Sequence, residues 1–178
     1  MTQVTFKGNP VNLAGNQINV GDKAPVIELV GKDLSKVQVG GAKQKVQILV
    51  TVPSIDTGVC ATQTLKFNEN AGKNPLVELT TISMDLPFAF GRFCGAEGID
   101  GINVASDFDG RKFGQNYGVI LKDCPLEGLL ARTIFVIDKD GVVAYKQIVP
   151  EITTEPDYEA LREAIKKLGA CNCDCSLK

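Results

Sequence analysis

The chain has 178 residues, 44% of them hydrophobic and 22% charged, and its formal net charge is −2. This length is enough for one domain with a sizeable core, and the composition excludes a disordered, collagenous or coiled-coil chain. With so little net charge and no run of like charges, we expect no nucleic-acid partner and no membrane binding. The apolar runs are too short to span a bilayer, and the N-terminus predicts no secretory signal.

The sequence contains neither histidine nor tryptophan. Nucleophilic sites that pair serine or cysteine with histidine, and zinc sites that use histidine, are therefore excluded for this chain alone. Any general base must be a carboxylate, a lysine, a tyrosine or a thiolate. Six cysteines are present. Without a secretory signal we expect a cytoplasmic protein, in which cysteines more often pack, bind metal or catalyse redox chemistry than form structural disulfides.

The chain opens with a predicted β-hairpin over residues 4–13, whose turn is Lys7-Gly8-Asn9-Pro10. Residues 45–52 are mostly apolar and β-branched, which predicts a strand buried on both faces and ended by Pro53. A helix follows over residues 60–71. It is predicted from side chains that recur on one face: Cys60, Thr64, Phe67 and Ala71.

The middle of the chain continues this alternation of strands and helices. A strand is predicted over residues 76–83, and a short helix capped by Asp85 over residues 85–93. Residues 102–105 form a further short strand. Residues 111–117 are predicted to be helical.

The last elements are a hairpin and a helix. Residues 132–137 and 142–149 are predicted strands joined by an Asp-Lys-Asp-Gly turn. A helix over residues 158–168 is predicted to begin at a capping pair formed by Thr154 and Asp157. The order of elements indicates an α/β protein with a thioredoxin-like fold: a central mixed β-sheet flanked by helices, with an N-terminal β-hairpin.

Cys60 lies between a buried strand and the start of a helix, where ligands of open α/β sheets collect. A sulfur at this place faces unpaired N–H groups and the positive end of the helix dipole, and both favour the reactive thiolate. The alternative is a small buried cysteine that only packs. A thioredoxin-type disulfide exchanger carries Cys-x-x-Cys here, but the first of those positions is Thr57.

The run Pro53-x-x-x-Thr57-x-x-Cys60 resembles the active-site motif of the peroxiredoxins. Three more segments, residues 91–95, 131–138 and 151–161, are similar to the bacterial thiol peroxidases, an atypical two-cysteine peroxiredoxin family. The resemblance covers residues 1–169. It implies a peroxidase that reduces hydrogen peroxide and organic hydroperoxides and needs no cofactor or metal.

The same resemblance implies the roles of five residues. Cys60 is expected to be the peroxidatic nucleophile that becomes a sulfenic acid. Thr57 is expected to hydrogen-bond the thiolate and the peroxide, Pro53 to shield the sulfur, and Arg132 to stabilise the thiolate and polarise the O–O bond. Cys94 is expected to resolve the sulfenic acid as an intrachain Cys60–Cys94 disulfide. Thioredoxin is the implied reductant, and a homodimer the implied assembly.

Other features of the sequence leave alternatives open. The protein could instead be a redox sensor that passes oxidation to a partner without turnover. The predicted domain spans residues 1–169, and a cysteine-rich tail spans residues 170–178. A third alternative is a thiolate metal-binding protein that uses this tail. No role is assigned to Cys124, and the tail cysteines are Cys171, Cys173 and Cys175.

Overall fold

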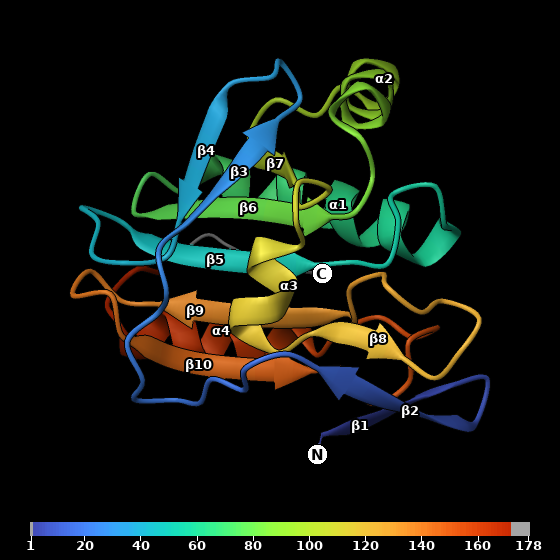
Figure 1. Cartoon of the computed structure of the whole chain (residues 1–178). Helices are drawn as coiled ribbons and strands as arrows, with labels where there is room; N and C mark the ends of the chain where they lie inside the picture. Colours follow the sequence, from blue (N-terminus) through green and yellow to red (C-terminus); the bar gives the residue numbers. More distant parts are fainter. Residues whose placement is uncertain (1, 172–178) are drawn as a thin grey trace.

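The computed structural model describes residues 2–171 and has a seven-stranded sheet between helices (Figure 1). The strands are β1 (Gln3–Phe6), β2 (Asn9–Ala14), β3 (Ile27–Gly31), β4 (Lys36–Val39), β5 (Val46–Thr51), β6 (Val77–Ser83), β7 (Asn103–Ser106), β8 (Ile120–Lys122), β9 (Thr133–Ile137) and β10 (Val143–Ile148). The helices are α1 (Gly58–Asn70), the short 3-10 helix η1 (Ala71–Lys73), α2 (Pro87–Glu97), α3 (Lys112–Tyr117) and α4 (Tyr158–Lys167).

The large sheet is mixed, with strand order β10-β9-β5-β6-β7-β3-β4. The three central strands β5, β6 and β7 are parallel, while β9, β10, β3 and β4 each run antiparallel to their neighbours. The carboxyl ends of the three parallel strands therefore lie at one edge, where α1 and α2 begin. The predicted thioredoxin-like α/β fold is confirmed.

Strand β5 lies in the interior of the sheet, between β9 and β6, and all six of its residues are buried. Ile48 and Val50 pack into the core beneath α1, α2 and α4, whereas Leu49 packs into the core on the α3 side. This alternation follows from the period of two along a strand. Cys60, in the helix that follows β5, therefore lies at the carboxyl edge of the parallel strands.

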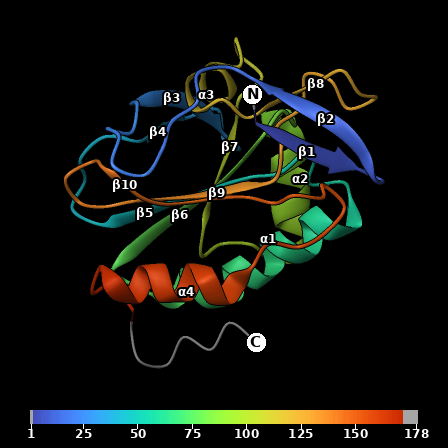
Figure 2. The ribbon, with the colours of Figure 1, turned by 90° about the horizontal axis from the view of Figure 1, so that it is seen from below.

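The helices cover the sheet unequally. Figure 2 shows α1 and α4 on one side of the sheet and α3 on the other. The stacked rings of Phe113 and Tyr117 anchor α3 to its face, with ring centroids 4.0 Å apart. Within residues 2–171, no helix is long and apolar enough to cross a bilayer.

The predicted N-terminal hairpin is confirmed as β1 and β2, joined by a two-residue turn at Lys7 and Gly8. Both turn residues have positive φ, 52° and 81°, which is the conformation of a tight hairpin and explains the glycine. Strand β8 joins β2 to complete a separate three-stranded sheet. The tail predicted for residues 170–178 lies almost wholly outside the described residues.

Two predicted caps are wrong. Asp85 does not cap α2: the N-cap is Leu86, with no side-chain hydrogen bond, and the Asp85 carboxylate instead accepts hydrogen bonds from the loop before α1. Thr154 does not cap α4: the Asp157 carboxylate accepts the N–H of Ala160 there. In both cases a short polar side chain had more than one backbone partner within reach, and sequence spacing does not distinguish them.

Candidate active site

Cys60 occupies the first turn of α1 and is fully buried, with no exposed surface. Pro53, also buried, follows the end of β5 and begins the loop that leads to this helix. Thr57 is the N-cap, and its Oγ1 accepts the N–H of Cys60 at 3.4 Å. Among the described contacts, no hydrogen bond joins Thr57 Oγ1 to Cys60 Sγ. The threonine therefore fixes the backbone that carries the sulfur.

Arg132 contacts the Cys60 sulfur from the strand next to β5. It precedes β9, which is antiparallel to β5, so its side chain starts beside the carboxyl end of β5. Arg132 Nη2 donates to Cys60 Sγ at 3.4 Å, although the arginine is only 2% exposed. Within residues 2–171, no carboxylate lies within ion-pair distance of it. A buried cation without a carboxylate partner is costly unless polar groups accept its hydrogen bonds, and the Cys60 sulfur is one of these acceptors.

Two further groups hold the guanidinium in place. Arg132 Nη1 donates to Gln63 Oε1 at 2.7 Å, and Nε and Nη2 donate to the carbonyl of Ile152 at 3.2 and 3.0 Å. Gln63 is fully buried one turn after Cys60, and its Nε2 has no hydrogen-bond partner among the described residues. Gln63 was not predicted from the sequence. Its spacing of three from Cys60, which puts both on one helix face, was the available signal.

The Ile152 carbonyl is itself positioned by the N-terminal hairpin. Two backbone hydrogen bonds join Thr5 to this segment. The N–H of Thr5 donates to the Pro150 carbonyl, and the N–H of Ile152 donates to the Thr5 carbonyl. The neighbouring carboxylate of Glu151 accepts hydrogen bonds from the Thr5 hydroxyl and from the turn N–H groups of Lys7 and Gly8. The hairpin therefore supports the arginine indirectly.

Glu151 gives a testable link between pH and stability. Hydrogen bonds from the side chains of Thr5 and Thr153, and from the N–H of Gly8, lower the pKa of Glu151 to about 2. A depressed carboxyl pKa stabilises the fold above the unfolded value near 4.5, and the contribution is lost as pH falls toward 2. We expect Glu151→Gln to lower the urea midpoint at pH 7, and the difference from wild type to shrink between pH 4.5 and 2. An equal midpoint at pH 7 would contradict this role; Glu69→Gln, an exposed carboxyl on α1, is the control.

Cys94 lies on α2 and is 4% exposed, among the side chains of Phe90 and Phe93. Burial raises the pKa of the Cys94 thiol, and the charge of Lys32 opposes this in part. In this structure Cys60 and Cys94 are both free thiols. Burial in the folded α2 therefore favours the protonated form of the Cys94 thiol.

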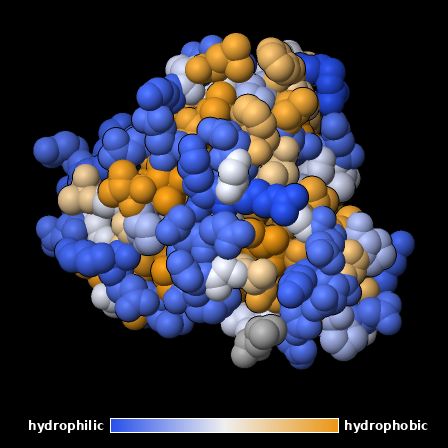
Figure 3. Space-filling model, viewed as in Figure 1, coloured by the Kyte–Doolittle hydropathy of each residue, from blue (hydrophilic) through white to orange (hydrophobic). Residues whose placement is uncertain are grey.

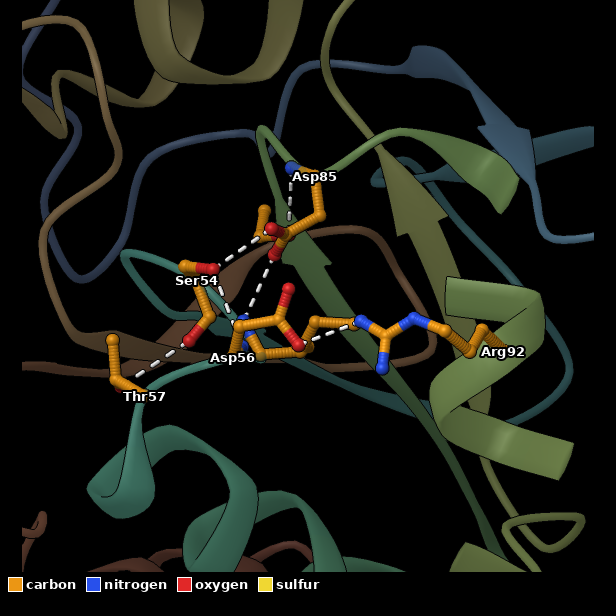
Figure 4. A network of polar contacts seen from close by, with 7 residues as sticks. Ser54, Asp56, Thr57, Asp85 and Arg92 are labelled. Carbon is orange, nitrogen blue, oxygen red and sulfur yellow. Dashed lines mark hydrogen bonds and ion pairs between the residues drawn. The ribbon is translucent and has the colours of Figure 1, made fainter. Parts of the chain in front are cut away.

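The loop before α1 is tied to α2 by a polar network (Figure 4). The Asp85 carboxylate accepts the Ser54 hydroxyl and the N–H of Ile55, each at 2.8 Å. Arg92 of α2 forms a 2.7 Å ion pair with Asp56 of the loop. The segments that carry Cys60 and Cys94 are thus directly connected.

The remaining cysteines and acidic groups form no further site in the described part of the chain. Cys124 is a free thiol, and both Cys124 and Cys171 are partly exposed. No group of three Cys, Asp or Glu side chains within residues 2–171 is arranged to hold a metal ion. Cys173 and Cys175 lie outside the described residues.

A buried cysteine in the first turn of a helix, in contact with a buried arginine from the neighbouring strand of a thioredoxin-like sheet, is the arrangement expected of a peroxiredoxin-like protein. The Redoxin family model matches residues 19–161. The thiol peroxidase of Campylobacter jejuni is 49% identical over 98% of this chain and 99% of that protein. The chain therefore belongs to the thiol peroxidase family of the redoxins, and it is a peroxiredoxin-type peroxidase, an oxidoreductase.

Solved structures agree with this assignment. The crystal structure of a peroxiredoxin-like protein from Aquifex aeolicus has a TM-score of 0.90 and 51% identity, covering 94% of this chain and 98% of that one. A thiol peroxidase from Chromobacterium violaceum has a TM-score of 0.79 at 21% identity, covering 93% and 95%. The second likeness supports the fold alone.

Proposed function

We propose that this peroxidase reduces hydrogen peroxide and organic hydroperoxides to water and alcohols, with Cys60 as the peroxidatic cysteine. The observation that carries the proposal is the 3.4 Å contact between Arg132 Nη2 and Cys60 Sγ, both buried. A structural cysteine would not need a buried guanidinium without a carboxylate partner. The site instead offers a positive charge to a sulfur anion and to the oxygen that leaves.

In the first step, the Cys60 thiolate attacks one peroxide oxygen. The S–O bond forms as the O–O bond breaks, the attacked oxygen keeps its proton so that Cys60 becomes a sulfenic acid, and the leaving oxygen takes a proton from water. Ionisation of the thiol alone explains little of the rate acceleration. A free thiol of pKa about 8.5 is already roughly 3% thiolate at pH 7, so full ionisation raises the rate only about 30-fold. Enzymes typically lower barriers by at least about 8 kcal/mol.

The rest of the acceleration must come from orientation and charge stabilisation. Arg132, fixed by Gln63 and the Ile152 carbonyl, is placed to stabilise negative charge on the leaving oxygen. Thr57 fixes the first turn of α1, and its hydroxyl, which donates to the Ser54 carbonyl in this structure, is proposed to turn toward an incoming peroxide. Pro53 is proposed to shield the sulfur from bulk water, consistent with its burial.

In the second step, Cys94 attacks the sulfenic sulfur. The Cys60–Cys94 S–S bond forms, the S–O bond breaks, and hydroxide leaves with the Cys94 proton as water. A disulfide needs Cα atoms within about 7 Å, and two cysteines buried on separate helices seldom meet this geometry. We therefore propose that the first turn of α1 and part of α2 unwind between the two steps.

Thioredoxin is the proposed reductant of the disulfide, and the cytoplasm the proposed location, since turnover requires a compartment that keeps dithiols reduced. Opening of α2 would expose the disulfide to a partner dithiol. The alternative of a redox sensor shares the first two steps. A redox sensor would differ from the proposed peroxidase only in failing to turn over with thioredoxin.

We also propose a homodimer. Leu86, Phe88 and Phe108 are large apolar side chains that are 51%, 69% and 44% exposed. The start of α2 and the loop after β7, which carry them, are joined, because the Ser106 hydroxyl donates to the Asp85 carbonyl and the Phe108 N–H to Ser106 Oγ. Apolar residues gather over α2 in Figure 3. Exposed apolar side chains beside one another favour burial against a second copy.

The Cys94→Ser variant tests the proposed cycle. It should consume one equivalent of peroxide at a near wild-type rate, because Cys60 and Arg132 are unchanged, and then fail to turn over with thioredoxin. The measurement is steady-state NADPH oxidation in the presence of thioredoxin and its reductase, alongside a single-turnover assay. Full steady-state turnover by Cys94→Ser would refute the resolving role. Wild-type protein that reacts once and never recycles would favour the sensor.

A further inference from the structure

Asp85 joins the two loops that precede the cysteine-bearing helices. It lies between β6 and α2, and its carboxylate accepts three hydrogen bonds: from the hydroxyls of Ser54 and Ser83 and from the N–H of Ile55. Ser54 and Ile55 belong to the loop that ends in the Thr57 cap. Hydrogen bonds to an ionised acceptor are among the stronger ones. Asp85 therefore holds the start of α1 against the start of α2.

A second link lies further along both segments. Asp56 is next to the Thr57 cap, and Arg92 lies two residues before Cys94. Arg92 Nη2 and Asp56 Oδ1 are 2.7 Å apart, and the side chains are 62% and 55% exposed. In Figure 4 the Arg92 side chain extends from α2 toward the loop beside Asp56, below Asp85. The ion pair thus joins the segment before Cys60 to the segment before Cys94.

We propose that Asp85 and the Asp56–Arg92 ion pair form a clamp that holds α1 and α2 in their folded arrangement and limits the rate at which Cys94 resolves the Cys60 sulfenic acid. The inference rests on the proposed two-cysteine cycle. The clamp acts only on the second step, because neither Asp85 nor Arg92 contacts Cys60 Sγ or the Arg132 guanidinium.

The clamp has a chemical consequence. While α1 remains folded, the sulfenic acid stays beside Arg132, where a second hydroperoxide can oxidise it to the sulfinic acid and release water or alcohol. Resolution by Cys94 competes with this reaction. A weaker clamp opens more often, so it should speed disulfide formation and protect Cys60 from overoxidation.

Arg92→Gln is the main test, because it removes the exposed ion pair and leaves the core intact. In stopped-flow mixing with hydrogen peroxide, the second-order step should stay within about twofold of wild type. The first-order, peroxide-independent step should accelerate about two- to fivefold, the range expected for one exposed ion pair. The peroxide concentration that converts half of Cys60 to sulfinic acid, measured by peptide mass spectrometry, should rise by the same factor. Asp85→Asn should give a larger acceleration if it folds.

The control is Lys166→Gln on α4, which removes a 2.8 Å ion pair with Glu163 whose side chains are 50% and 52% exposed. It should change neither step. The double variant Asp56→Lys/Arg92→Asp places opposite charges at the two positions again, so the rate of the first-order step should return toward wild type. If Arg92→Gln acted only through a local loss of packing, the double variant would not restore the rate. A first-order step that is unchanged or slower in Arg92→Gln overturns the clamp. Failure of wild type to form any Cys60–Cys94 disulfide overturns the proposed cycle instead.

Discussion

Replacing Cys60 with serine should lower the rate of hydroperoxide reduction by at least about 1,000-fold, because the hydroxyl cannot accept the peroxide oxygen and the barrier lowering of the site is lost. The side chain is fully buried in the first turn of α1, and serine fits the space of cysteine, so the fold should persist. The measurement is peroxide loss under single-turnover conditions with fully reduced protein.

The matched control is Cys124→Ser, which removes a partly exposed thiol from a loop without a proposed role. It should retain near wild-type activity. Comparable losses in the two variants would indicate that peroxide reacts with the cysteines indiscriminately, and would contradict a specialised site at Cys60.

Replacing Arg132 with lysine should lower the second-order rate constant for peroxide by at least about 100-fold, the loss typical of removing one donor to a developing oxyanion. Lysine keeps the charge but not the planar set of donors that reaches Cys60, Gln63 and the Ile152 carbonyl together. The reaction should be followed by stopped flow at several peroxide concentrations.

Two controls separate catalysis from folding in the Arg132→Lys variant. Arg111→Lys, at an exposed arginine before α3, should leave the rate constant unchanged. The rate of alkylation of Cys60 by iodoacetamide, which has no O–O bond, should fall much less than the rate with peroxide. Equal losses with both reagents would show that Arg132 changes only the general reactivity of the Cys60 sulfur. A normal rate with peroxide would show that Arg132 has no role in the reaction.

The sequence predicted the elements whose pattern is local. The apolar run of β5 and the one-sided spacing of α1 gave both elements to within a few residues, and with them the position of Cys60. Strands β3 and β4 were missed because they pair at one end of the sheet, where exposed side chains such as Glu28 and Gln38 alternate with buried or half-buried ones. Such short segments lack a continuous apolar signal.

The site was predictable in part. Resemblance to a family pointed to Arg132, and the structure places it against Cys60. Gln63 and the Ile152 carbonyl were not found, because both act on Arg132 across long sequence distances, and a backbone carbonyl has no sequence signature. Asp85 was expected to cap its own helix, and it hydrogen-bonds a neighbouring loop instead. Local spacing predicts the elements, whereas the contacts between loops depend on how the strands are ordered.

The most direct test of the account is to identify which sulfur receives oxygen in the first turnover. Reduced Cys94→Ser protein would be mixed with one equivalent of hydroperoxide, trapped with a sulfenic-acid reagent, digested and analysed by mass spectrometry. We predict that the adduct lies on the peptide containing Cys60, with Cys124 and Cys171 remaining thiols. An adduct spread over the other cysteines, with Cys60 unmodified, would contradict the central claim that the contact with Arg132 activates this one sulfur.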